Sequence, residues 1–121
     1  MIEVRKVIQS HLKTIHPRIF FQKAYENAQF PYVVYEIEIL DLGDNLQLVT
    51  LDVDGWSDDY SDTTDLENLM SNIDASFKKE IIINDSLVIS FYRDRKLSII
   101  DDDPRINRRK YIYQARLYER L

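Results

Sequence analysis

Aspartates concentrate in two short stretches of the chain and are its most promising catalytic side chains. The stretch LDVDGWSDD holds Asp52, Asp54, Asp58 and Asp59, and three further aspartates occupy positions 101–103. A two-metal nuclease needs several carboxylates that converge within a few ångströms, and these residues are the candidates for such a site. Asp52 and Asp54 stand two apart, which in a strand places both on the same face. They either share a metal ion or face water together.

The surrounding residues favour the solvent-facing interpretation. Apolar and polar residues alternate from position 49 to position 54, which is typical of an antiparallel sheet with one dry face. We therefore expect Asp52 and Asp54 to lie on the wet face together with Glu36 and Glu38. A nuclease site would also need a lysine near the carboxylates, and residues 48–65 contain none. The metal-dependent nuclease stays open as the enzyme alternative.

Other common catalytic and cofactor sites lack the residues to build them. The chain has no cysteine, which excludes thiolate nucleophiles, zinc-thiolate sites and disulfides. With only Gly43 and Gly55, no glycine-rich phosphate loop can be drawn. His11 and His16 do not have a metal-ligand spacing, and we expect them in solvated or capping positions. The sequence predicts no catalytic residue, no bound metal and no cofactor.

A basic and aromatic segment near the end of the sequence raises nucleic-acid binding as a third alternative. Single strands bind to aromatic rings that lie beside cations. The segment contains Arg105, Arg108, Arg109, Lys110, Arg116 and Arg120 near Tyr111, Tyr113 and Tyr118. The acidic pI of about 5.0 argues against this function, as does the need for some of these tyrosines in the core.

Length and composition indicate one folded domain over residues 1–121. A chain of 121 residues with 45% hydrophobic and 31% charged side chains can bury a single core. No run of 18 apolar residues is present, and the opening stretch MIEVRKVIQSHL carries charges where a secretory leader needs an apolar segment. We therefore expect a protein that stays in the cytoplasm or in something assembled there.

Charge is distributed unevenly along the chain. Residues 31–80 hold thirteen acidic and two basic side chains, residues 1–30 hold five basic and two acidic, and residues 93–121 hold nine basic and five acidic. Such segregation either pairs within the monomer or creates two faces of opposite sign, which would favour head-to-tail contacts between copies. The sequence leaves both interpretations open.

Apolar periodicity predicts two helices. The first covers residues 2–15 and ends before Pro17, with a stripe of Val4, Val7, Ile8, Leu12 and Ile15. The second begins near Thr64, where Thr64 and Glu67 fit a capping box and Asp62 and Asp65 favour the positive end of the helix. Its stripe comprises Leu66, Leu69, Met70, Ile73 and Phe77, and Lys78 and Lys79 follow at its C-terminal end.

Alternating patterns predict the strands. A short apolar run at 18–24 is predicted to form a strand, and it is followed by a long strand from Pro31, a turn at 42–45 and a return strand at 46–56. Further strands are predicted at 80–83, at 86–96 with a possible extension to 100, and at 110–120. The sequence therefore predicts a two-layer α+β domain: one mainly antiparallel sheet of four to five strands with two helices packed on one face.

Four phrases in this order of elements resemble a known family. They are FPYVVYEIE at 30–38, VTLDVDGW at 49–56, TTDLENLMSNID at 63–74 and RRKYIYQARLY at 108–118. Together they resemble the tail-terminator, or tail-completion, proteins of long-tailed bacteriophages and prophages. Several of those proteins share a P-Y-v-v-y strand, an l-d-v-d-x-W strand and a helix of about this length. The likeness covers nearly the whole chain and consists of structural patterns, not of catalytic signatures.

This resemblance implies a non-enzymatic structural protein of the virion. Such proteins form a ring, commonly a hexamer, which caps the finished tail tube and joins the tail to the head through the neck. The implied partners are other copies of the chain and the tail-tube and neck proteins, with no membrane and no sequence-specific nucleic acid. The implied location is the host bacterial cytoplasm during assembly and then the virion tail or neck. A head-tail connector or neck protein is the nearest structural alternative.

The candidate interface for subunits or partners combines the aspartate stretches with the following arginines. It comprises Trp56, Asp58, Asp59, Asp101, Asp102, Asp103, Arg105, Arg108 and Arg109. Trp56 either closes the edge of the core or anchors a partner. The segment from Ile99 to Arg109 is predicted to become ordered on assembly. In a ring that passes DNA, an acidic or neutral lumen is expected, because a basic one would hold the phosphates.

Overall fold

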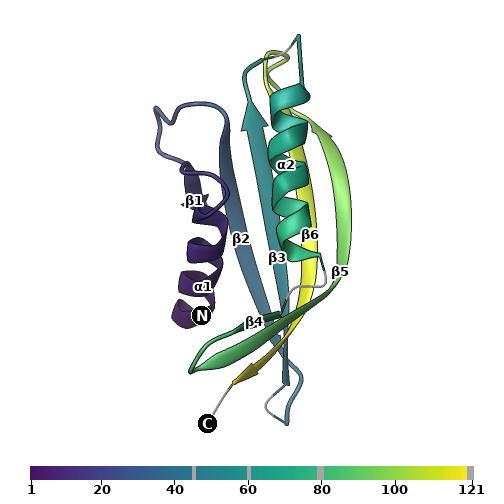
Figure 1. Ribbon diagram of the computed structural model, residues 1–121. Helices are drawn as coiled ribbons and strands as arrows, with labels where there is room; N and C mark the ends of the chain where they lie inside the picture. Colours follow the sequence, from purple (N-terminus) through teal and green to yellow (C-terminus); the bar gives the residue numbers. More distant parts are fainter. Residues whose placement is uncertain (45, 60, 79–80, 120–121) are drawn as a thin grey trace.

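The computed structural model describes residues 1–44, 46–59, 61–78 and 81–119, which form an α+β fold with two helices and one sheet (Figure 1). The elements in chain order are α1 (Ile2–Lys13), β1 (Ile19–Phe21), β2 (Tyr32–Asp41), β3 (Leu46–Ser57), α2 (Thr64–Phe77), β4 (Ile81–Ile83), β5 (Leu87–Ile100) and β6 (Asn107–Glu119). No helix in this described part of the chain is long and apolar enough to cross a membrane.

The sheet has six strands in the order β1-β2-β3-β6-β5-β4, whereas the sequence predicted four to five. β1 pairs in parallel with β2, and all other neighbours are antiparallel. The two edge strands, β1 and β4, have three residues each, which is too short for a periodic signal. The apolar runs at 18–24 and 80–83 predicted both strands, and hydrogen bonding to a longer neighbour sets their three-residue length.

Both helices cover the same face of the sheet, as predicted (Figure 1). The odd-numbered residues of β2, β3 and β6 point to this face, and they form the core with the apolar stripes of the helices. The strands contribute Val33, Tyr35, Val49, Leu51, Val53, Tyr111, Tyr113, Ala115 and Leu117, and the helices contribute Val4, Ile8, Leu12, Leu66, Leu69, Met70, Ile73 and Phe77. No helix among the described residues covers the other face of the sheet.

The start of α2 differs from the predicted capping box. Thr63 is the N-cap residue without a side-chain capping bond, and Thr64 is the first helical residue. Asp62 accepts hydrogen bonds from the backbone N and the side-chain Oγ1 of Thr64 at 2.9 and 2.6 Å. Glu67 does not reach back to the N-cap because it pairs with Arg109 of β6. Lys78 is the C-cap of α2, and the predicted Lys79 lies outside the described residues.

β5 contains an irregularity that reverses its two faces. Its register against β6 shifts between Phe91 and Arg93. Before the shift, Ile89 and Phe91 point toward the helices; after it, Asp94 and Lys96 take that side, opposite Tyr113 and Tyr111. A bulge inserts one residue and so inverts the alternation beyond it. Lys96 can therefore reach Asp74 of α2, with 2.9 Å between Nζ and Oδ2.

Candidate interface at the end of the sheet near α2

The residues predicted as an interface gather at one end of the sheet. β3 and β5 end there and β6 begins there, since Ser57, Asn107 and Ile100 are neighbours in the register. α2 begins at the same end (Figure 1). The residues placed there are Trp56, Asp58, Asp59, Asp101, Asp102, Asp103, Arg105, Arg108 and Arg109. They do not form one continuous surface, because they point to different sides of the sheet.

Asp54 is buried and paired, which corrects the prediction that it faces solvent. Its side chain is on the helix-free face, and only 8% of the residue is exposed. Arg108 Nε donates to Asp54 Oδ1 at 3.2 Å, and Lys110 Nζ lies 3.7 Å from Asp54 Oδ2. Lys110 Nζ also lies 3.8 Å from Oδ2 of Asp52, which is half-buried. The register of β3 against β6 brings these charges together, and it could not be derived from the spacing of the aspartates alone.

This pairing decides what Asp52 and Asp54 can do chemically. Two cations of the same chain, Arg108 and Lys110, lie beside these carboxylates and would compete with a metal ion for them. Within residues 1–44, 46–59, 61–78 and 81–119, no three histidine or carboxylate side chains are grouped to hold a metal. A lysine does lie near these carboxylates, although residues 48–65 contain none: it is Lys110 of β6. It forms ion pairs with Asp52 and Asp54.

Trp56 lies in an aromatic group on the helix-free face, not at the edge of the core. Its ring stacks on Tyr32 with centroids 6.1 Å apart, and the Arg108 guanidinium lies 4.5 Å above it. Tyr32 in turn contacts Phe20 and Phe30 at centroid distances of 6.1 and 5.0 Å. Trp56 Nε1 is buried, and no described group accepts its hydrogen bond. An aromatic group with an arginine stacked on it is a typical protein-binding surface.

The predicted assembly-ordered segment is part strand and part loop. Ile99 and Ile100 belong to β5, and Asn107 to Arg109 belong to β6, which leaves only residues 101–106 as a loop. Asp103 binds Arg105 in a bidentate pair, with Nε–Oδ1 at 3.1 Å and Nη2–Oδ2 at 3.0 Å. The hydrogen bonds from Arg105 lower the pKa of Asp103. The loop is therefore closed by its own short-range contacts.

Asp58 and Asp59 form the exposed start of the connection from β3 to α2. Asn107 Nδ2 donates to the backbone oxygen of Asp59 at 2.8 Å, which ties this connection to the start of β6. The carboxylate of Asp59 accepts a hydrogen bond from Ser61 Oγ at 3.0 Å. Asp59 is therefore held in place by its backbone, and Asp58 presents negative charge to solvent near Arg105.

The basic stripe considered for nucleic-acid binding is not continuous. Arg105, Arg108 and Lys110 pair with aspartates, while Arg109 pairs with Glu67 on the helix-covered side. Tyr111 and Tyr113 belong to the buried core, so they are not free to stack on bases. Arg116 lies 5.1 Å from the ring centroid of Tyr92, and Arg120 lies outside the described residues. Cations that are already paired contribute little to phosphate binding.

Both histidines are half-buried and hydrogen-bonded, which corrects the prediction of a solvated His11. His11 lies against Phe77 with ring centroids 4.6 Å apart, and its Nε2 is 2.9 Å from Ser76 Oγ. Ser76 donates its own proton to the Ile73 backbone oxygen at 2.6 Å, so its hydroxyl is not activated by His11. His16 Nε2 donates to the Pro31 oxygen at 2.9 Å, and burial lowers the pKa of His16.

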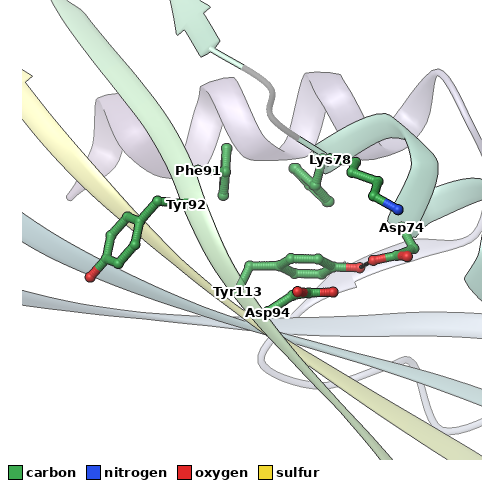
Figure 2. A pocket seen from close by; sticks show the side chains of 7 residues that line it. Asp74, Lys78, Phe91, Tyr92, Asp94 and Tyr113 are labelled. Carbon is green, nitrogen blue, oxygen red and sulfur yellow. Dashed lines mark hydrogen bonds between the residues drawn. The ribbon is translucent and has the colours of Figure 1, made fainter.

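A hollow of 210 Å³ opens between the end of α2 and β5 (Figure 2). Tyr113 points into it and donates its hydroxyl to Asp74 Oδ1 at 2.9 Å, while Tyr92 points away. Burial, followed by the hydrogen bond to Asp74, raises the pKa of Tyr113 far above its usual value. A hydroxyl of this kind stays protonated and cannot act as a base or nucleophile. The hydroxyl of Tyr113 therefore serves to hold α2 against the sheet through Asp74.

Several residues at this end of the sheet were not among the predicted interface residues. Tyr32, Asn107 and Lys110 have no distinctive local spacing, and only the registers of β2 with β3 and of β3 with β6 bring them beside Trp56, Asp59 and Asp54. The alternating polar pattern at the start of the last strand is the one sequence feature that points to Asn107 and Lys110. Cross-strand neighbours have to be known before such a cluster can be identified.

Comparisons with known proteins identify a shared fold without a shared sequence family. No family model matches the chain, and no curated protein matches it. One similar solved structure, known only by a sequence identifier, covers 97% of this chain and 96% of its own at a TM-score of 0.65 and 10% identity. Another is a chain from the virion of a native gene transfer agent (GTA) particle, with a TM-score of 0.57, 12% identity and coverage of 93% and 91%.

Proposed function

We propose that this chain is a non-enzymatic structural subunit of a phage-like particle, and that its role is that of a tail terminator. In this role, copies of the chain form a ring, commonly a hexamer, that caps the tail tube and joins the tail to the head. The observation that carries the proposal is the fold shared with a chain from the virion of a GTA particle, over nearly the full length of both chains. The sequence phrases that resemble tail terminators support the finer assignment.

The chemistry of the described residues fits a structural role. The carboxylates that a nuclease would need are paired with Arg108 and Lys110. The histidines and Tyr113 are held in packed positions with their hydrogen bonds made inside the fold. By contrast, the end of the sheet near α2 presents an aromatic group, a stacked arginine and exposed aspartates, which suit contacts between proteins.

Deletion of the gene in a strain that produces the parent particle tests the tail-terminator role. Electron microscopy should show tails of abnormal length without heads, because nothing closes the tube. Supplying the wild-type protein should restore joined particles. Tails of normal length beside separate heads would instead indicate the head-tail connector alternative, and unchanged particles would refute both roles.

The enzyme alternative is tested directly on the purified protein. Plasmid DNA incubated with the protein and magnesium or manganese should stay intact, because cations of the same chain compete with the metal for Asp52 and Asp54. Cleavage that disappears in an Asp54→Asn variant would overturn the structural role. A gel shift with single-stranded DNA tests the nucleic-acid-binding alternative in the same way.

A further inference from the structure

The helix-free face of β2 carries an exposed row of residues with no partner in the described part of the chain. Glu36, Glu38 and Leu40 alternate along β2, and all three are exposed. None of the ion pairs within residues 1–44, 46–59, 61–78 and 81–119 involves either glutamate. Glu36 lies directly opposite Asp52 in the register. Lys110 already pairs with Asp52, so Glu36 and Glu38 are left for a cation supplied from outside.

The outer surface of α1 carries a row of the opposite character. Ile2, Lys6 and Lys13 are exposed, and Ile2 is 59% exposed. Their spacing of i, i+4 and i+11 places them within about 40° of one another around the helix, so they form one stripe. Neither lysine takes part in an ion pair with the described residues, and Lys13 only donates to the Pro17 oxygen at 2.8 Å.

The two rows match in order and in spacing. Along the helix, Lys6 and Lys13 lie about 6 and about 17 Å from Ile2, at 1.5 Å per residue. Along β2, Glu38 and Glu36 lie about 7 and about 14 Å from Leu40, at about 3.4 Å per residue. An apolar residue followed by two charges of one sign therefore faces an apolar residue followed by two charges of the other. The remaining difference of about 3 Å is within the reach of a lysine side chain, which has four methylene groups.

We propose that α1 of one copy packs against the helix-free face of β2 of the next copy, with Ile2 near Leu40, Lys6 near Glu38 and Lys13 near Glu36. This contact uses two different surfaces of the chain, so each copy can bind one neighbour on each side. Repeated around an axis, such a heterologous contact closes into a ring. The inference rests on the proposed ring-forming function and adds the surface that joins its subunits.

A second copy fits this face better through α1 than through its own sheet. Face-to-face packing of two helix-free surfaces would bring the glutamate rows of both copies together. The helix stripe instead supplies two cations for the two glutamates, one of which already opposes Asp52. Charge complementarity therefore selects the head-to-tail arrangement.

Site-directed cross-linking tests this contact, because the natural chain has no cysteine. Lys6→Cys and Glu38→Cys are purified separately, mixed and treated with a short bismaleimide. The mixture should give a cross-linked dimer, whereas each variant alone should not, because the two positions belong to different surfaces. The double variant Lys6→Cys/Glu38→Cys should give a ladder of larger products. Cross-linking of Glu38→Cys with itself would support face-to-face packing and overturn the proposal.

Matched controls use the exposed Lys23 and Glu26, which have the same residue types and lie in the connection after β1. Mixtures of Lys6→Cys with Glu26→Cys, and of Lys23→Cys with Glu38→Cys, should give severalfold less dimer. Equal yields in all mixtures would overturn the contact. If the contact fails while the wild-type protein still restores joined particles in the deletion strain, the tail-terminator role stands and only this interface is wrong.

Discussion

Asp54 occupies the most constrained position among the acidic residues of β3. It accepts a hydrogen bond from Arg108, which also stacks on Trp56, so one arginine links the carboxylate to the aromatic group. Lys110 lies within 4 Å of both Asp54 and Asp52. Removing the charge of Asp54 would leave Arg108 and Lys110 facing each other in a partly buried place. Asp52 is more exposed and shares only Lys110.

Asp54→Asn should therefore lower the free energy of unfolding by about 1–3 kcal/mol, because two partly buried cations lose their main partner. Asp52→Asn should change it by no more than about 0.5 kcal/mol and serves as the matched control. Urea denaturation followed by tryptophan fluorescence measures both, since Trp56 is the only tryptophan and contacts Arg108. Equal, small effects of both variants would show that Asp54 is solvated after all.

His16 gives a pH dependence whose sign follows from its surroundings. Burial is the main cause that lowers its pKa in the folded state below the ordinary value of 6.5, and Arg18 and Lys13 act in the same direction. The unfolded chain then binds a proton at a higher pH than the folded chain does. The stability contributed by neutral His16 is present above pH 6.5 and is lost as the pH falls toward the folded-state pKa.

The free energy of unfolding should accordingly decrease between about pH 7.5 and about pH 5.5, a range in which carboxylates of ordinary pKa hardly titrate. In a His16→Gln variant, which keeps a donor for the Pro31 oxygen, this decrease should be smaller. Denaturation curves of both proteins at three pH values in this range provide the measurement. A variant with the same slope as the wild type would contradict the role of His16.

At the scale of elements, the packing of α2 on β3 depends on Gly55. A Cβ atom at this position would lie 2.6 Å from Met70 Sδ and 3.0 Å from Leu66 Cδ1. Both neighbours are fully buried, so they have little room to move. Gly55→Ala should therefore destabilise the protein by about 1–3 kcal/mol through overpacking.

A second substitution distinguishes the steric contact with Met70 from an effect of Gly55 on the backbone. The double variant Gly55→Ala/Met70→Ala should be less destabilised than the sum of the two single variants, because Met70→Ala removes the atom nearest to the new Cβ. The coupling between the two sites is measured by thermal unfolding of the single and double variants. Additive effects would mean that Gly55 matters for its backbone and not for contact with α2.

The long elements could be predicted because each carries a complete periodic signal. The stripe from Leu66 to Phe77 and the alternation along β2 and β3 fixed α2 and the central hairpin within a few residues. The bulge after Phe91 could not be predicted, since its position depends on how β5 meets β6. The pairing of Asp54 with Arg108 and Lys110 depends on a register 54–56 residues away in sequence, for which the local pattern holds no information.

At the scale of the whole molecule, the cations near the two ends of the chain differ in their ion pairing. All the described ion pairs use cations from residues 93–121, and four of their acidic partners, Asp52, Asp54, Glu67 and Asp74, come from residues 31–80. The five cations of residues 1–30 take part in no ion pair with the described residues. Internal pairing therefore involves Lys96, Arg105, Arg108, Arg109 and Lys110, and it leaves the N-terminal cations for other contacts.

If unpaired charges hold copies together, self-association should weaken as salt is added. Sedimentation velocity at rising protein concentration should show larger species at about 0.05 M salt and mostly monomer at about 0.5 M, because the Debye length falls from about 14 to about 4 Å over this range. The free energy of unfolding should change much less with salt, since apolar burial dominates it.

In a Lys6→Glu variant the low-salt species should be lost, and adding Glu38→Lys should restore them, whereas the matched pair Lys23→Glu and Glu26→Lys should have no effect. Assembly that strengthens with salt would instead indicate an apolar contact, with the exposed Leu40, Leu42 and Ile81 as its first candidates.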